Sequence, residues 1–172
     1  MMNLKNKWKI LFVIDYKSSR AASTRFTFLA CPGLGERNNT VSEQISLNVL
    51  LVEDHPVNLT LGKKMLTKKG HNVVIAKNGQ EAVDAYKQSQ NEHKFDLILM
   101  DLLMPVMDGL EASKAIREIE SNAQDRVPII AMTGKSAEES LEECKEAGMD
   151  DLISKPMKIP EIIELYEKIT NK

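Results

Sequence analysis

The chain has 172 residues, of which 42% are hydrophobic and 28% charged, and its formal net charge is −2. This is the composition of a globular protein with a buried core, at a length that suits one compact domain plus an appendage. No apolar run approaches the roughly 20 residues of a membrane span. The longest apolar run in the first twenty residues, residues 10–14, is too short for the hydrophobic region of a signal peptide. The two cysteines, Cys31 and Cys144, lack metal-ligand spacing and suit a reducing compartment, so we expect a cytoplasmic protein.

Charge is unevenly spread along the chain. Residues 1–46 carry seven Lys/Arg against three Asp/Glu, whereas residues 47–172 carry sixteen against twenty-two. Surfaces that bind nucleic acid are basic, so the acidic body argues against a nucleic-acid partner.

Residues 1–46 are predicted to be an N-terminal extension of a domain that spans residues 47–172. The stretch 18–40 is rich in Ser, Thr, Arg, Asn and Gly without a sustained period, which favours a poorly structured segment. Residues 9–15 nevertheless repeat the pattern of residues 48–54, an apolar run ending in Asp, at an offset of 39. Two interpretations stay open: a remnant of a second copy of the domain, or chance.

The first predicted strand and helix follow this extension. Residues 49–52 form an apolar run typical of a strand buried on both faces. Pro56 suits the first position of a helix, and Gly70 is expected to end that helix. The apolar positions of the helix recur at i, i+4 and i+8, at Val57, Leu61 and Met65.

The alternation of strand and helix patterns continues to the C-terminus. Further strands are predicted at residues 73–75, 97–100, 127–132 and 152–153. Two helices start at the spacing of a capping box, Asn78 with Glu81 and Ser136 with Glu139. Apolar positions with helical period mark the last three helices, at Ala112, Ala115, Ile116 and Ile119, at Leu141 and Cys144, and at Ile162, Leu165, Tyr166 and Ile169.

Five strand–helix units predict an α/β fold, a doubly wound five-stranded parallel sheet covered on both faces. In such sheets the functional site lies at the carboxyl ends of the strands. Five side chains with reactive or charged groups fall at or just after predicted strand ends: Glu53, Asp54, Asp101, Thr133 and Lys155. We therefore expect them to gather in one crevice.

The chemistry of this set points to a cation and a phosphoryl group. Three neighbouring carboxylates without a cation would raise at least one pKa, and hard oxygen ligands suit Mg²⁺ or Mn²⁺. Each residue alone has a structural explanation, as a helix cap, a turn former or a solvated lysine. What favours a site is that all of them terminate strands on the same edge.

Four segments closely resemble the receiver domain of two-component response regulators, in order and in spacing. They are residues 49–54 (VLLVED), 100–109 (MDLLMPVMDG), 128–134 (PIIAMTG) and 148–156 (GMDDLISKP). The resemblance covers about residues 47–170 and is greatest to receivers at the C-terminus of hybrid histidine kinases. It implies a flavodoxin-like receiver fold and a role in phosphorelay signal transduction.

The resemblance also implies a role for each candidate. Asp101 would accept a phosphoryl group from the phosphohistidine of a histidine kinase or a histidine phosphotransfer protein. Glu53, Asp54, Asp101 and the backbone carbonyl of Leu103 would hold Mg²⁺. Thr133 and Lys155 would contact the phosphoryl group, and the peptide bond before Pro156 would be cis.

Two positions depart from the family pattern. Leu152 replaces the aromatic residue that swings inward on activation in receivers, so the expected response of the output surface is in doubt. Leu103, two residues after Asp101, cannot position an attacking water, which predicts slow to moderate self-dephosphorylation.

Alternative functions are also weighed against the sequence. An aspartyl-nucleophile phosphohydrolase would commonly need an acid two residues after its nucleophile, but position 103 is Leu. A transcription factor would need a helix-turn-helix motif or a basic surface, and neither is visible in the sequence. We therefore expect a phosphoacceptor module and not a dedicated enzyme. Whether it is free-standing or part of a hybrid kinase stays open.

Overall fold

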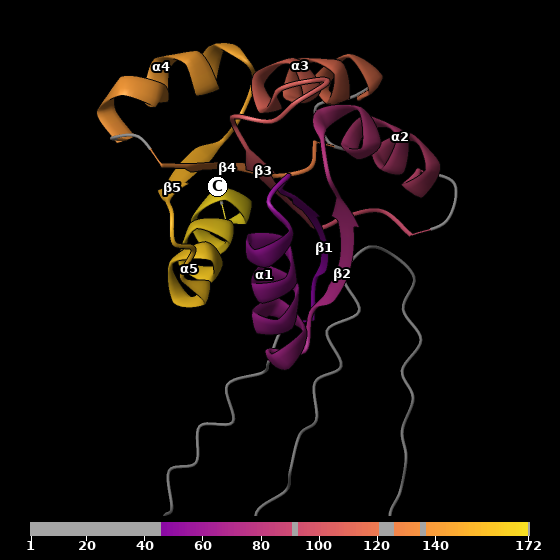
Figure 1. Cartoon of the computed structure of the whole chain (residues 1–172), viewed down its shortest axis with the longest axis vertical. Helices are drawn as coiled ribbons and strands as arrows, with labels where there is room; N and C mark the ends of the chain where they lie inside the picture. Colours follow the sequence, from indigo (N-terminus) through magenta and orange to yellow (C-terminus); the bar gives the residue numbers. More distant parts are fainter. Residues whose placement is uncertain (1–45, 91–92, 121–125, 135–136, 172) are drawn as a thin grey trace, which may run out of the picture. The chain divides into compact units, whose positions relative to one another are not determined.

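A computed structural model describes residues 46–90, 93–120, 126–134 and 137–171. Strands and helices alternate along the described chain (Figure 1): β1 Asn48–Val52, α1 Pro56–Lys68, β2 Asn72–Ala76, α2 Gly79–Ser89, β3 Leu97–Asp101, α3 Gly109–Ile119, β4 Ile129–Thr133, α4 Ala137–Glu146, β5 Asp151–Ser154 and α5 Ile159–Thr170. Residues 1–45 of the predicted N-terminal extension, with the repeat at 9–15, and the Ser136 cap lie outside the described residues. None of the described helices is both long and apolar enough to cross a membrane.

The strands form one parallel sheet in the order β2-β1-β3-β4-β5. Helices α2, α3 and α4 cover one face and α1 and α5 the other, as Figure 1 shows. Each face has its own core, in which side chains such as Ile116 of α3 and Ile162 of α5 are fully buried. The predicted doubly wound α/β fold is confirmed, and the short strand predictions are correct to within a few residues.

The apolar repeat at Val57, Leu61 and Met65 does not coincide with the buried face of α1. Val57 and Leu61 are 66% and 54% exposed, and the buried positions are instead Leu59, Gly62 and Leu66. Gly62 brings α1 close to the sheet, since a Cβ there would lie 2.9 Å from a methyl group of Leu51 and would collide with Met157. The consequence is that apolar side chains of α1 remain at the surface.

Helix caps agree with the sequence only in part. The Asn78 side chain accepts a hydrogen bond from the Glu81 N–H at 2.8 Å, but the Glu81 carboxylate accepts from the Lys77 N–H and so does not complete the box. A full capping box lies at α3, where Asp108 and Glu111 each accept from the other's N–H. This D-x-x-E spacing is present in the sequence but does not figure in the predictions made from it.

An arginine on α3 fixes the amino-terminal ends of β4 and β5. The Arg117 guanidinium binds Glu120, the carbonyl of Val127, and Asp150 at 2.9 Å. The Asp150 carboxylate in turn accepts the Ile129 N–H. Tyr86 lies beside the same Glu120 that Arg117 binds, and burial together with the Glu120 carboxylate raises the pKa of Tyr86 to about 12. This network stabilises the end of the sheet opposite the predicted site.

Candidate functional site

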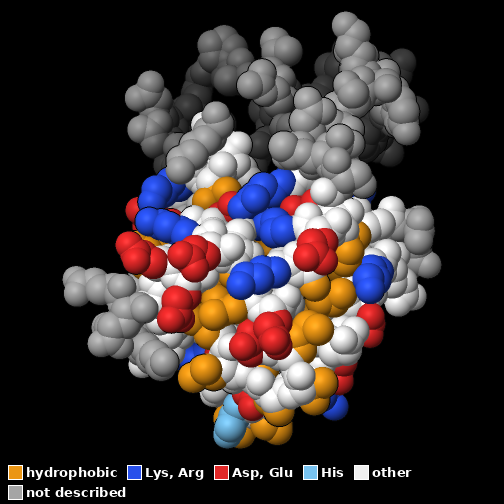
Figure 2. All heavy atoms as spheres, turned by 90° about the horizontal axis from the view of Figure 1, so that it is seen from above, with side chains coloured by type: hydrophobic (Ala, Val, Ile, Leu, Met, Phe, Trp, Pro, Cys, Tyr) orange, Lys and Arg blue, Asp and Glu red, His pale blue; other side chains and the backbone are white. Residues whose placement is uncertain are grey.

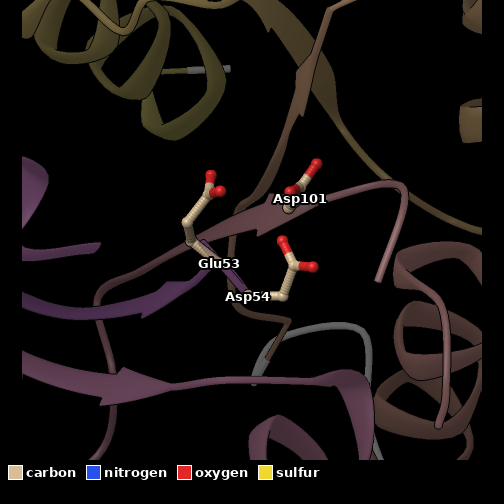
Figure 3. A group of neighbouring side chains, drawn as sticks. All are labelled: Glu53, Asp54 and Asp101. Atoms are coloured by element: carbon tan, nitrogen blue, oxygen red, sulfur yellow. The ribbon is translucent and has the colours of Figure 1, made fainter. Parts of the chain in front are cut away.

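Three carboxylates meet at the carboxyl edge of the sheet. Glu53 and Asp54 follow β1, and Asp101 is the last residue of the neighbouring strand β3. One oxygen from each of the three lies within 4.8 Å of the others, and Figure 3 shows the side chains converging from the two strand ends. Glu53 and Asp101 are buried, whereas Asp54 is exposed to solvent. The strand-end prediction is therefore correct for these three residues.

Lys155, which follows β5, reaches the same cluster. Its Nζ lies 2.7 Å from Glu53 Oε2 and 2.6 Å from Asp101 Oδ2, so one ammonium bridges two carboxylates. The backbone N–H of Lys155 donates to the carbonyl of Thr133 at 2.8 Å, which ties the end of β5 to the end of β4. The peptide bond between Lys155 and Pro156 is cis, as the family resemblance implies.

Burial and charge act in opposite directions on the two partners of this ion pair. Burial raises the pKa of Asp101, and the bonds from Lys155 offset this only in part. For Lys155 burial works to lower the pKa, but the hydrogen bonds and charges of Asp101 and Glu53 outweigh it and raise the pKa overall. The ammonium therefore stays charged, and the formal charges of three carboxylates and one ammonium leave an excess of two negative charges in the cluster.

The remaining carboxylate oxygens show where a cation fits. Asn58 Nδ2 donates to Glu53 Oε1 at 3.0 Å and so orients this side chain from the first turn of α1. The Asp54 carboxylate has no hydrogen bond or ion pair with any described residue. An all-oxygen donor set with an excess of two negative charges suits a divalent cation such as Mg²⁺. Asn58 does not figure in the sequence predictions, although it lies five residues after Glu53 in the helix that Pro56 starts.

The loop after β3 folds back over Asp101. The Leu103 N–H donates to Asp101 Oδ1 at 3.4 Å, and the Gly109 N–H donates to the Leu102 carbonyl at 3.1 Å. A Cβ at position 109 would collide with the carbonyl oxygen of Asp101, so the chain needs glycine there. Val106 adopts a φ of 73°, a costly conformation for a β-branched residue. The loop leaves the side chains of Leu103 and Val106 exposed, at 69% and 84%.

Thr133 and Leu152 lie on the two strands beyond β3. Thr133 is the last residue of β4, one position after Met132, which is the register partner of Asp101. Thr133 is buried, with 3% of its surface exposed. Leu152 of β5 is half-buried and packs against the core on the α2–α4 side of the sheet. An aliphatic side chain thus occupies the position expected for the aromatic residue of the family.

An apolar crevice opens beside the charged cluster, between α1 and the chain that follows β5. It has a volume of about 310 Å³ and contains Glu53 and Lys155 in its wall. Most of the remaining lining is apolar, from Leu61, Met65, Met132 and Met157 among others. Leu61 and Met65 of α1 therefore line the same crevice as Glu53 and Lys155 of the charged cluster.

Comparison with known proteins gives consistent results. The family described as the response regulator receiver domain matches residues 49–167. Hybrid signal transduction histidine kinase I of Dictyostelium discoideum is 43% identical over 132 residues, which are 76% of this chain and 7% of that protein. Histidine kinase 5 of Arabidopsis thaliana is 36% identical over 152 residues, 74% of this chain and 16% of that protein. The chain thus spans less than a fifth of these relatives.

Two solved structures of single receiver domains are similar to this chain over most of their length. The receiver domain of the sensor histidine kinase PA1611 from Pseudomonas aeruginosa, solved with a magnesium ion in its active-site cleft, has a TM-score of 0.63 and 36% identity, covering 74% of this chain and 100% of that one. The receiver domain of Ssk1 from Saccharomyces cerevisiae, solved with the histidine phosphotransfer protein Ypd1, has a TM-score of 0.60 and 34% identity, covering 73% and 87%.

Proposed function

This chain belongs to the response regulator receiver domain family, and we propose that its Asp101 accepts a phosphoryl group from a phosphohistidine in a phosphorelay. One observation carries the proposal above all. The Lys155 ammonium lies 2.6 Å from Asp101 and 2.7 Å from Glu53, at the edge of the sheet where Asp54 also lies. Such a cluster combines a carboxylate nucleophile with a fixed positive charge that stabilises a transferring phosphoryl group.

The transfer exchanges one bond for another. An oxygen of Asp101 attacks the phosphorus atom, the phosphorus–nitrogen bond of the donor breaks, and the donor imidazole leaves. Lys155 then neutralises charge on the phosphoryl oxygens, and the hydroxyl of Thr133 donates a hydrogen bond to one of them. Asn58 and Lys155 hold Glu53 in place while this occurs, since both bind its carboxylate.

The residues that would hold Mg²⁺ are Glu53, Asp54, Asp101 and the backbone carbonyl of Leu103. The bound ion would supply charge neutralisation at the phosphoryl oxygens, which is the main need in phosphoryl transfer. Two features of this chain support the assignment: the all-oxygen donor set and the uncompensated charge of the cluster. The magnesium ion in the cleft of the PA1611 receiver domain supports it independently.

A histidine kinase or a histidine phosphotransfer protein would dock over this site. Large apolar side chains are exposed on two elements next to the site in the chain, at Val57 and Leu61 on α1 and at Leu103 and Val106 on the loop after β3, and Leu61 shares a crevice with Glu53 and Lys155. Exposed apolar side chains that gather near a site are typical of protein-binding surfaces. The complex of Ypd1 with the Ssk1 receiver domain supports this class of partner.

We propose that the protein is a signalling module that acts in the cytoplasm by being phosphorylated, and not a multiple-turnover enzyme. A phosphohydrolase would need a general acid to protonate its leaving group, commonly two residues after the nucleophile. That position is Leu103, which is apolar and 69% exposed. The hydrolase alternative is therefore disfavoured by the same residue that we expect to slow dephosphorylation.

The experiment that tests the proposal is phosphorylation by a small donor. The full chain is incubated with acetyl phosphate and Mg²⁺, and its intact mass is compared with that of Asp101→Asn. We expect the wild type to gain one phosphoryl group and the variant to gain none. Asp84→Asn is a matched control, because Asp84 is an exposed carboxylate on α2 and should leave labelling unchanged. Labelling of Asp101→Asn at the wild-type level would overturn the proposal.

A further inference from the structure

Helix α1 separates two hollows, and only one of them belongs to the site described above. The second is a groove of about 500 Å³ between α1 and the edge strand β2. Its lining includes Leu59, Lys63, Lys64, Lys68 and Ile75, and it shares no residue with the crevice beside Asp101. The groove is therefore a separate surface feature with its own chemistry.

The groove carries positive charge without counter-charge. Helix α1 contains three exposed lysines, Lys63, Lys64 and Lys68, and no acidic residue. None of the three has an ion pair with a described residue, in a domain where residues 47–172 carry sixteen basic against twenty-two acidic residues. Figure 2 shows the opposite arrangement on the face covered by α2, α3 and α4, where charges of both signs are interspersed. Unmatched lysines around an apolar floor favour an acidic ligand with apolar side chains.

The strand beside the groove has an open edge. Among the described residues β2 pairs only with β1, and on that side Asn72 donates its N–H to the Leu47 carbonyl just before β1, while the Ala76 carbonyl accepts from the Glu53 N–H just after it. Because alternate residues of a strand point their backbone groups to opposite sides, those of Val73 and Ile75 face the outer edge. Edge strands are commonly protected by charged residues or proline, but β2 (NVVIA) has neither, and Val74 is 48% exposed.

We propose that this edge and groove bind an acidic, extended segment of a partner protein, which adds a sixth strand beside β2. Backbone hydrogen bonds to Val73 and Ile75 would hold the segment. Its side chains alternate between two faces, so acidic ones on the α1 side would lie over Lys63, Lys64 and Lys68. Residues 1–46 of this chain are a poor occupant, since they carry seven basic against three acidic residues.

The test is a titration of the ¹⁵N-labelled full chain with a synthetic peptide in which Glu alternates with Val. Expected are chemical-shift changes at residues 63–68 and 73–75, slower amide exchange at Val73 and Ile75, and weaker binding as salt is raised. Replacing Lys63, Lys64 and Lys68 together by Gln should weaken binding at least several-fold. The matched control replaces three exposed lysines on α2, α3 and α4 by Gln, at Lys87, Lys114 and Lys145, and should bind as the wild type does.

Three outcomes would overturn the proposal. One is the absence of shift changes at these residues, and another is equal binding by a peptide in which Lys replaces Glu. The third is self-association of the chain, seen by sedimentation, that the Lys63/Lys64/Lys68 variant abolishes, because the occupant would then be a second copy. Binding by Asp101→Asn at wild-type affinity is expected, so this result does not depend on phosphorylation.

Discussion

Lys155 Nζ lies 2.6 Å from Oδ2 of Asp101, across the 54 positions that separate them in the chain. The strand order places β4 between β3, which ends at Asp101, and β5, which Lys155 follows, so the long lysine side chain spans the carboxyl end of β4. The same ammonium contacts Glu53, which makes Lys155 the counter-ion of both buried carboxylates. Stability and chemistry are therefore coupled at this residue.

Replacing Lys155 by Met should destabilise the chain in the absence of divalent cations. Two buried carboxylates would lose their only cationic partner among the described residues. Breaking a fully buried pair costs about 3–5 kcal/mol, and we expect about 1–3 kcal/mol here because the Lys155 side chain is 26% exposed. Urea unfolding measures the loss, and added Mg²⁺ should restore part of it. Lys168→Met is the control, since Lys168 is 61% exposed; an equal loss in both variants would contradict the account.

Replacing Gly109 by Ala should disturb the backbone of the phosphoacceptor itself. The new methyl group would collide with the carbonyl oxygen of Asp101, which cannot move without displacing the end of β3. We expect a loss of about 1–3 kcal/mol in unfolding free energy together with slower phosphorylation. At Gly134 an added Cβ would meet no atom of the described residues within 4 Å, so Gly134→Ala should leave the unfolding free energy and the phosphorylation rate almost unchanged. If Gly109→Ala had the stability and the labelling rate of the wild type, the close contact between position 109 and the Asp101 carbonyl would be contradicted.

The lifetime of the phosphorylated form should depend on Leu103. This side chain is 69% exposed beside Asp101 and offers no group that orients an attacking water. We expect slow to moderate loss of the phosphoryl group in Mg²⁺ and a several-fold faster loss in Leu103→Asn, whose amide can bind water. The decay of the phosphorylated species, followed by intact mass, measures both rates. A wild-type half-life of only seconds would contradict this interpretation.

Acid should weaken the fold through His71. This residue is buried, and its Nδ1 accepts a hydrogen bond from the Leu47 N–H at 3.3 Å. Burial lowers its pKa from the usual 6.5, so the unfolded chain binds the proton more readily than the folded one. The contribution of His71 is therefore full above pH 6.5 and falls as the pH drops below it.

The measurement is the difference in unfolding free energy between about pH 7.5 and about pH 5.5, in the wild type and in His71→Gln. Other groups titrate in this range too, so the comparison between variants isolates His71. We expect a smaller acid-induced loss in the variant, and no such change in His55→Gln, since His55 is exposed. Equal losses in wild type and His71→Gln would refute the assignment.

Much of the fold and part of the site could be predicted because both rest on strong local signals. The central strands β1, β3 and β4 are almost uninterrupted apolar runs, and parallel strands bring their carboxyl ends to one edge. That rule by itself predicts that Glu53, Asp54 and Asp101 lie together. Their chemical roles, and that of Thr133, stay predictions, of which the phosphorylation experiments test that of Asp101.

The rest depends on tertiary packing that local patterns do not encode. Apolar residues lie on more than one side of α1, so periodicity alone did not distinguish Leu59 from Val57 as the buried position. The contacts of Asn58 with Glu53 and of Arg117 with Asp150 join charged or polar groups from different elements. Such pairs follow from side-chain reach and strand register, which appear only once the sheet is assembled.

The most direct test of the central claim is to locate the phosphoryl group on the chain. The full chain is phosphorylated with acetyl phosphate and Mg²⁺ and reduced with borohydride, which converts an acyl phosphate at aspartate to homoserine. Peptide mass spectrometry then identifies the modified residue. We predict conversion at Asp101 alone. Conversion at another acidic residue, with Asp101 intact, would contradict the account.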